Sequence, residues 1–489
     1  MRPVHVVPAG VVLLALGAVV GVAQLTAPAP PGPGQATVAP RQVGVTSAVR
    51  ACPPVRDGGA GQVAFIAAAP AATRSGASGQ AELTPLPLAG TAVQVLNPIT
   101  TAQPGALSML TTPAAHGTGH KAATVLQGWS VTASGTMAQA MEAEEATSAG
   151  LASVRCGEPG SDMWFVGPGR QGGAAQIQLD LMNIDVLPAS VDVSVITDAG
   201  LVQAGGEAGI TVPPHQTVTE SLSPLAGGLS VVAIEVRTSI GRVAADVSES
   251  SSHGGTASWL PSTAPPSTQL VIPGVPPSSR TAGLYIVVPG SANARISVLA
   301  LSAQGRYRPF GTQTVDLPGA SAAYVPLPPL GGTAALELTA NVPVTAEVLV
   351  PGSGLGAFAA ATAPISQQAV VAGNTTGSGL SPAIVLSAPA GPARVRLTDL
   401  AAASGAISSQ VVTVPAGHTL TVPAALPTGA PHGSAFAVVI TPLAGSGPLY
   451  AARVETQGQN TVVSILPAIS ALTTITLPPV RDSYDAISP

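Results

Sequence analysis

The densest acidic segment of the sequence holds three glutamates that could do chemistry, Glu142, Glu144 and Glu145. Paired carboxylates can act as general acid and base, and clustered carboxylates can bind Ca²⁺. A calcium loop usually alternates Asp and Asn around a glycine, and this run (MEAEEATSAG) lacks that arrangement. A strand or helix face with solvated charges is therefore the simpler interpretation. If the chain has an acidic site, these glutamates are its first candidates.

The histidines give no pattern typical of a metal centre or a catalytic group. His116 and His120 are four residues apart, which suits zinc only on a helix, and two glycines and a threonine lie between them. We therefore expect a solvated loop there. His215 and His418 follow turn prolines in related segments, so a turn role is the simpler interpretation. The sequence predicts no metal and no cofactor.

An adjacent aromatic pair, Trp164 and Phe165, stands out in a chain with only 3% aromatic residues. Exposed aromatic rings can stack on sugars, so the pair is a candidate contact for a glycan or a partner. The alternative is that Trp164 fills a sandwich core or a domain junction. Exposure of the pair, with Trp129 or Trp259 on the same face, would favour carbohydrate binding.

No nucleophile elbow, phosphate-binding loop or dinucleotide fingerprint occurs in a strand–turn–helix context. The glycine-rich run Gly167–Gly173 (GPGRQGG) has no predicted helix after it and indicates a turn. Because no cluster of titratable residues is visible in the sequence, we predict that the chain is not an enzyme.

The only two cysteines, Cys52 and Cys156, enclose one domain-sized segment. An even pair in an exported chain favours a disulfide, whereas a redox or metal pair would need close spacing and nearby ligands. Closing a loop of about a hundred residues would stabilise the fold by roughly 4–5 kcal/mol in the chain-entropy treatment. We predict a Cys52–Cys156 disulfide.

The composition excludes some partners and favours β-structure. Charged residues form 8% of the chain, the net charge is −5, and Lys121 is the only lysine, so no basic patch for nucleic acid is present. Glycine (55) and proline (49) suit turns between short strands and disfavour helix interiors. This composition favours an all-β fold.

The amino-terminal sequence has the layout of an export signal. After Arg2 comes an apolar run that ends near Leu25, which could be cleaved or could remain as a membrane anchor with the rest of the chain outside the cytoplasm. Residues 26–50 are rich in proline and small residues and indicate an extended tether.

A unit of about a hundred residues recurs along the chain. Three segments alternate apolar and polar residues, reach a proline and continue as a second alternating strand, which predicts a hairpin or an arch. They are Ile210–Leu222, Thr314–Leu327 and Val411–Ala424, with Pro213, Pro318 and Pro415 at their turns. Each unit holds at least six short strands with regular turn signals, as in a sandwich of immunoglobulin-like size. The alternative, a propeller, has blades of about half this length.

The fold prediction is all-β, with tandem immunoglobulin-like β-sandwich domains after an N-terminal signal or anchor helix. The linking segments before fresh apolar strands set the domain boundaries. The predicted parts are a signal or anchor at 1–25, a linker at 26–50, a divergent sandwich with the disulfide at 51–158, sandwich repeats at 161–265, 268–366 and 369–480, and a tail at 481–489.

The run GWSVTASGTMAQAMEAEEATSAGLASVRCGEPGSDMWFVGPG, with ITVPPHQTV and WLP further on, resembles a family of exported actinobacterial proteins, domain-of-unknown-function family 5719. The resemblance covers roughly residues 50–480. It implies an exported or membrane-anchored protein and carries no activity, substrate or catalytic residue.

We therefore expect a non-catalytic protein of the cell envelope, outside the cytoplasm, with a structural role or a role in contacting other proteins or the wall. An array of carbohydrate-binding modules at the cell surface is the alternative. Expected partners are envelope proteins or wall glycans, and the membrane if the N-terminal segment is not cleaved. Nucleic acid is not expected.

Overall fold

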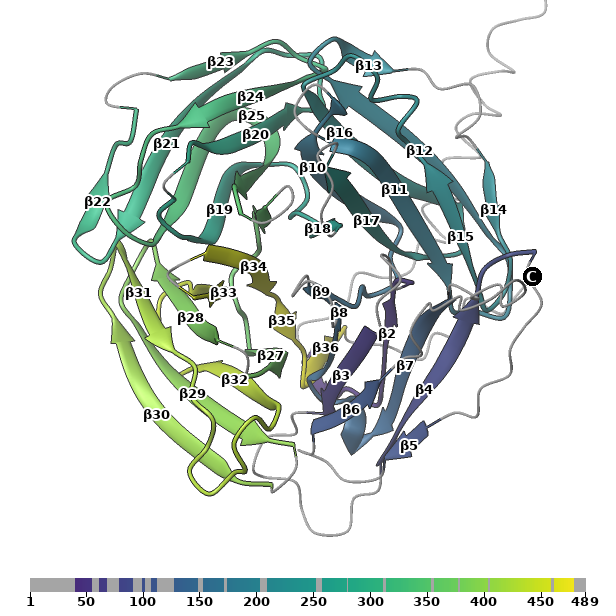
Figure 1. Cartoon of the computed structure of the whole chain (residues 1–489), viewed down its shortest axis with the longest axis vertical. Helices are drawn as coiled ribbons and strands as arrows, with labels where there is room; N and C mark the ends of the chain where they lie inside the picture. The colour runs from purple at the N-terminus through teal and green to yellow at the C-terminus, as the bar shows by residue number, and fades with distance from the viewer. Residues whose placement is uncertain are drawn as a thin grey trace, which may run out of the picture. The chain divides into compact units, whose positions relative to one another are not determined.

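A computed structural model of the chain describes most residues between 40 and 478 (Figure 1). These residues form thirty-six β-strands and a short 3₁₀ turn, η1 (Thr136–Ala138), so the all-β expectation is confirmed. The described ranges are 40–54, 61–67, 79–90, 99–101, 107–111, 127–147, 153–170, 174–202, 209–251, 257–278, 280–310, 314–352, 356–376, 379–402, 405–458 and 461–478.

Within these ranges no helix has the length and apolar character needed to cross a bilayer. The predicted signal or anchor, residues 1–25, and the predicted tail, 481–489, lie outside them. Contacts divide the chain into a large body, Gly44–Ile475, and a small body made of Met1–Val43 and Thr476–Pro489. At the ends of the described chain β1 (Arg41–Gly44) pairs with β36 (Thr474–Leu477).

The strands of the large body form four units of two sheets, which we call sandwiches 1 to 4. Sandwich 1 has the sheets β2-β7-β4-β5 and β6-β3-β8-β9. Its first strand begins at Ser47, inside the segment predicted as a tether. Its strands are β2 (Ser47–Cys52), β3 (Gly61–Ala67), β4 (Gly79–Pro87), β5 (Ile99–Thr101), β6 (Leu107–Thr111), β7 (Gln127–Gly135), β8 (Met141–Thr147) and β9 (Ser153–Arg155).

Sandwich 2 has one sheet in the order β10-β16-β12-β13, with β14 also on β12, and a second sheet β15-β11-β17-β18. Its strands are β10 (Asp162–Pro168), β11 (Ala174–Asn183), β12 (Ala189–Thr197), β13 (Gly200–Val202), β14 (Ile210–Val212), β15 (Gln216–Ser221), β16 (Val231–Ile240), β17 (Ala244–Ser251) and β18 (Ser258–Leu260).

Sandwich 3 joins its two sheets through one long strand, β25. The first part of β25 pairs with β19 and β21, and the second part pairs with β20 and β26. Its strands are β19 (Ser267–Val275), β20 (Ala282–Val288), β21 (Ala294–Ser302), β22 (Gly305–Tyr307), β23 (Val315–Leu317), β24 (Ser321–Leu327), β25 (Ala334–Val350) and β26 (Ala357–Ala360).

Sandwich 4 has the sheets β30-β29-β32-β27-β35 and β31-β28-β33-β34. Its strands are β27 (Gln368–Asn374), β28 (Leu380–Ala388), β29 (Ala393–Ala401), β30 (Ile407–Val414), β31 (His418–Pro423), β32 (Phe436–Pro442), β33 (Tyr450–Gln457), β34 (Thr461–Ala468) and β35 (Ser470–Ala471).

The proline turns are arches that carry the chain from one sheet of a sandwich to the other. In sandwich 4, for example, β30 pairs with β29 and β31 pairs with β28. Two residues after each turn proline the backbone has positive φ: 52° at His215, 50° at Ala320 and 75° at Gly417. The left-handed region suits glycine best. This conformation explains the turn role predicted for His215.

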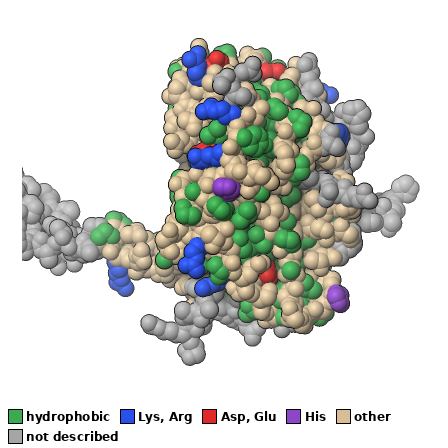
Figure 2. Space-filling view, turned by 90° about the vertical axis from the view of Figure 1, so that its left-hand side faces the viewer, with side chains coloured by type: hydrophobic (Ala, Val, Ile, Leu, Met, Phe, Trp, Pro, Cys, Tyr) green, Lys and Arg blue, Asp and Glu red, His purple; other side chains and the backbone are tan. Residues whose placement is uncertain are grey.

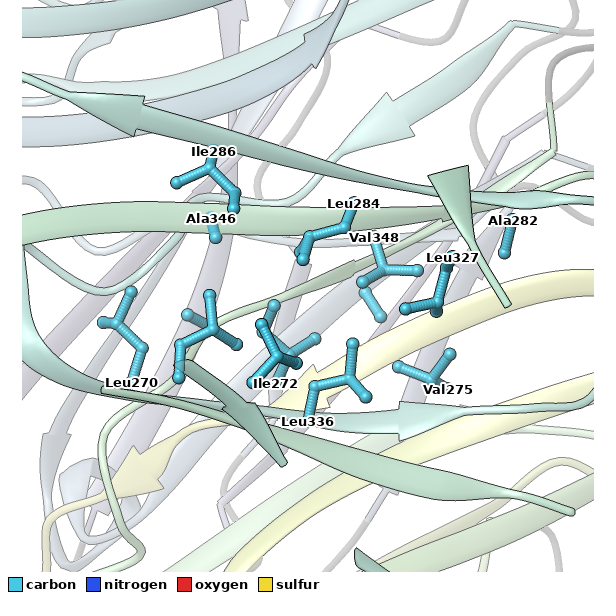
Figure 3. Packing of buried hydrophobic residues seen from close by; sticks show 14 of the residues in the cluster. Leu270, Ile272, Val275, Ala282, Leu284, Ile286, Leu327, Leu336, Ala346 and Val348 are labelled. Carbon is cyan, nitrogen blue, oxygen red and sulfur yellow. The ribbon is translucent and has the colours of Figure 1, made fainter. Parts of the chain in front are cut away.

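The core of sandwich 3 shows how two sheets share apolar residues. Leu284 and Ile286 of β20 face Leu270 and Ile272 of β19 across the gap between the sheets (Figure 3). The period of two places these side chains on one face of each strand, as the alternating sequence predicted.

The opposite faces of the sheets are buried too. Tyr285, between Leu284 and Ile286, joins the apolar cluster of sandwich 2, and Phe358 of β26 does the same. Similar clusters join sandwich 1 to sandwich 2 and sandwich 3 to sandwich 4. A further cluster joins sandwich 4 back to sandwich 1 through Val370 and Ile66. The contacts among the four sandwiches therefore form a closed order, which sequence alternation did not predict.

Propeller blades also pack sheets of this size face to face. In this protein, however, the strands of one sheet do not follow one another along the sequence. In sandwich 2, successive strands β10, β11 and β12 alternate between the two sheets. Because the two sheets share one interleaved stretch of chain, the repeat in the sequence is a hundred residues and not half of that.

Candidate functional site

The acidic run lies on β8 and is buried. Glu142, Glu144 and Glu145 are at most 2% exposed, so the interpretation as a solvated face was wrong. Glu142 and Glu144 project from one face of the strand and Glu145 from the other. Buried carboxylates are costly unless they are paired or protonated, so their surroundings decide what they can do.

Two arginines hold Glu142. Arg50 Nε of β2 donates a hydrogen bond to Glu142 Oε1 at 3.2 Å, and Arg155 Nη1 of β9 forms an ion pair with Glu142 Oε2. Burial alone would lower the pKa of Arg50, but the charges of Glu142 and Glu158 outweigh burial and raise that pKa above its ordinary value. The group is therefore a buried ion cluster that joins β2, β8 and β9.

Glu144 joins sandwich 1 to sandwich 4. Its Oε2 accepts a hydrogen bond from Arg453 Nη1 at 2.9 Å and one from the backbone N–H of Gly373 at 3.1 Å. Arg453 is fully buried, and it also donates from Nη1 to the carbonyl of Gly373 at 2.6 Å and from Nη2 to Ser153 Oγ at 2.7 Å. This carboxylate is saturated with donors and serves as a bridge between sheets.

The third glutamate belongs to a group of buried acids between sandwiches 1 and 2. Burial raises the pKa of Glu145 well above the ordinary carboxyl value, and the charge of Asp180 adds to the rise. Burial does the same to Asp246, with Asp180 and Glu145 adding to it. These shifts favour the protonated form of Glu145 and of Asp246.

Two more buried acids lie between sandwiches 2 and 3. Burial raises the pKa of Glu249 and of Glu347 well above the ordinary value. The backbone N–H of Val166 donates to Glu347 Oε1 at 3.2 Å, and this bond partly opposes the rise.

Each sandwich has a buried charged residue at one shared position, directly after an alanine in a late strand. The pairs are Ala143–Glu144, Ala245–Asp246, Ala346–Glu347 and Ala452–Arg453. Sequence reasoning missed Asp246, Glu347 and Arg453, although aligning this alanine and its charged neighbour across the repeats would have found them.

A cavity of about 170 Å³ lies among sandwiches 1, 2 and 4. Its lining includes Arg50, Glu142 and Arg155 of sandwich 1, Asp246 and Trp259 of sandwich 2, and apolar residues of β34. Among the described residues Asp246 Oδ2 and Arg155 Nε have no hydrogen-bond partner. The cavity therefore offers an indole ring, a carboxyl group and a guanidinium group, which suits a small polar molecule.

The aromatic pair is not a surface platform. Trp164 and Phe165 lie on β10 and are buried in the apolar cluster of sandwich 2, and Trp129 is buried in sandwich 1. Carbohydrate binding by Trp164 and Phe165 would require exposed rings, and these rings are buried. Trp259 alone of these residues lines the cavity.

In the part of the chain that the structure describes, no three His, Cys, Asp or Glu residues are placed to hold a metal ion. His116 and His120 lie outside the described residues. The predicted disulfide is present: Cys52 of β2 is bonded to Cys156, just after β9, and it joins the two sheets of sandwich 1.

The sequence of the chain matches a known protein family. Residues 111–425, from the end of β6 to just after β31, match a family of unknown function, DUF5719. The chain belongs to this family. No curated protein matches the chain. The DUF5719 match contains the acidic run on β8, the cavity residues Asp246 and Trp259, and all of sandwiches 2 and 3, while Arg453 lies beyond it.

Proposed function

We propose that this DUF5719 protein is a non-catalytic protein of the cell envelope, placed outside the cytoplasm, with a structural or protein-binding role. The observation that carries the proposal is the use of its buried charges. Glu144 and Arg453 bind each other across two sandwiches, and Glu142 is held between two arginines. Carboxylates bound in this way stabilise a framework, which supports a structural role.

The placement outside the cytoplasm is supported by two independent features. A disulfide between Cys52 and Cys156 suits an oxidising compartment. The sequence of residues 1–25 has the layout of an export signal or a single anchor helix.

For the fold, we infer four tandem sandwiches of immunoglobulin-like size. About a hundred residues and two facing sheets in each unit support this inference. The strand order differs from that of an immunoglobulin domain. In sandwich 2 the late strand β17 pairs with β11, whereas the last strand of an immunoglobulin domain lies in the other sheet.

Crosslinking in intact cells, followed by identification of the captured chains, tests the proposed role. We expect capture of envelope proteins. Tight retention of the purified chain on wall polysaccharide would contradict a purely structural role.

The cavity favours a second candidate function, the binding of a small wall-derived saccharide. Trp259 supplies a ring for stacking, and Asp246 and Arg155 supply polar groups. Titration calorimetry with wall-derived sugars tests this candidate. Trp259→Leu should abolish any heat of binding, while the matched change of a buried tryptophan away from the cavity, Trp129→Leu, should preserve binding wherever that variant folds. Equal loss in both variants would reject the cavity as the site.

A further inference from the structure

The outer edge of sandwich 4 differs from the same edge of sandwiches 2 and 3. In sandwich 2 the edge consists of β13 and β14, which pair with β12 in two different registers: Thr197 with Gly200, and Ala189 with Val212. The second register is shifted by four residues, so a continuous edge strand cannot form there. Sandwich 3 has the same division into β22 and β23 on β21, with the same shift.

In sandwich 4 one unbroken strand occupies this edge. β30 pairs with β29 over eight residues in one register, from Ala393 with Val414 to Leu400 with Ile407. Within the described residues no strand pairs with its other side. Natural sheets commonly protect their edges with short strands, as in sandwiches 2 and 3, or with charges, prolines and bulges. β30 (ISSQVVTV) has none of these.

The hydrogen-bonding groups that β30 leaves unused can be assigned from its pairing. Ala401 donates its N–H to Ala406, so alternate residues from Ser408 onward bond to β29. The N–H and C=O groups of the intervening residues therefore point away from the sheet. They are Ile407, Ser409, Val411 and Thr413. Ile407 is 65% exposed and Val411 is 51% exposed, which is unusual for apolar side chains in a strand.

We propose that β30 pairs antiparallel with β30 of a second copy of this chain, and so joins two sheets edge to edge. The strand is self-complementary, because Gln410 then faces its own copy on the two-fold axis and Ser409 faces Val411. In this register the outward residues form the hydrogen-bonded pairs, which gives about eight inter-strand hydrogen bonds. Paired Gln410 amides add a cross-strand contact.

Charge does not oppose this pairing. β30 has no ionisable residue, and the nearest arginines, Arg394 and Arg396, are on β29. Across the joined sheet the two β29 strands are three strand spacings apart, about 14 Å. This distance exceeds the screening length of about 8 Å at physiological ionic strength. The face of the molecule in Figure 2 likewise carries mostly uncharged and hydrophobic atoms, with scattered charges.

The surface area that the contact buries indicates how stable the dimer is. An edge of eight residues buries less than the roughly 1,200 Å² of an ordinary stable interface, so we expect a reversible dimer. Dimer formation should then depend on protein concentration.

Sedimentation velocity of the full chain in mild detergent, over about a hundredfold range of concentration, tests the proposal. The unmodified chain should shift from monomer to dimer. Val411→Lys places a charge on the exposed edge without touching the core, and it should raise the dissociation constant about tenfold or more. The matched control is Leu201→Lys on the short strand β13, where the side chain is 53% exposed, and it should leave dimerisation unchanged. A monomer at every concentration, or equal loss in both variants, would overturn the proposal.

Cysteine crosslinking tests the register. Both native cysteines are in the disulfide, so a new thiol is the only one available. Gln410→Cys should form a disulfide-linked dimer under mild oxidation, because two copies of this residue oppose each other at disulfide distance. Ser408→Cys should not, since it opposes Val412 of the other copy. Equal crosslinking from both positions would contradict the proposed pairing.

Discussion

Arg453 Nη1 lies 2.9 Å from Glu144 Oε2, although the two residues are 309 positions apart in the sequence. Both are buried, and they join the last sandwich to the first. A buried ion pair contributes little when compared with an apolar replacement, but removal of one partner leaves an uncompensated charge. The pair therefore links sandwich 4 to sandwich 1, and the first of four predictions tests this link.

Arg453→Met should destabilise the chain by about 3–5 kcal/mol, because Glu144 then stays buried without its cation. Denaturant unfolding followed by circular dichroism measures the loss. Adding Glu144→Leu to Arg453→Met should recover much of it. Arg295→Met, which removes an exposed ion pair with Asp316, should leave the unfolding midpoint unchanged. An unaltered midpoint in Arg453→Met would show that the bridge does not hold the sandwiches.

Stability should fall as the pH rises above the ordinary carboxyl range. Glu249 and Glu347 have raised pKa values in the folded chain, so they keep protons that the unfolded chain releases above a pH of about 4.5. Unfolding then releases protons, and higher pH favours the unfolded chain until it exceeds the folded pKa values.

Glu249→Gln should flatten this dependence and stabilise the chain at pH 8, because the amide has no proton to release on unfolding. Melting temperatures between pH 5 and pH 9 measure the slope. A steeper slope in Glu249→Gln would contradict the assigned protonation.

Ala320→Gly should stabilise the chain slightly, by up to about 1 kcal/mol. Ala320 has a φ of 50° at the arch where sandwich 4 has Gly417, and a left-handed backbone costs an alanine about 1–2 kcal/mol, of which the greater flexibility of unfolded glycine removes part. The reverse change, Gly417→Ala, should destabilise by about 1 kcal/mol, since a Cβ there would also lie 3.3 Å from Arg306 Nε. Thermal unfolding of both variants checks the opposite signs, and equal signs would refute the account.

Loss of the disulfide should destabilise sandwich 1 most. Replacement of Cys52 and Cys156 by serine should cost about 4–5 kcal/mol in the chain-entropy treatment. Hydrogen exchange should show faster exchange of β2 and β9 than of β28 or β33. A reducing agent should lower the stability of the unmodified chain and have no effect on the double-serine variant. Uniformly faster exchange in all four sandwiches would contradict a local role.

Local patterns in the sequence predicted the elements that depend on neighbouring residues. Alternation in β12 and proline at the arches follow from short-range geometry, and the structure shows strands and arches at these places. The disulfide was predicted from the even number of cysteines, and the structure shows it too. The acidic run was identified as a candidate, but its burial was not. A glutamate on a strand is solvated or buried according to what covers that face, and for Glu144 the cover is Gly373 and Arg453 from sandwich 4.

By itself, the sequence determined an all-β chain of hundred-residue units, because the period of two and the turn prolines act over a few residues. Only the tertiary structure decided that both faces of the sheets are buried, that sandwich 4 returns to sandwich 1, and that one edge strand, β30, is unbroken. These features depend on surfaces brought together from distant parts of the chain, and local periodicity carries no information about such contacts.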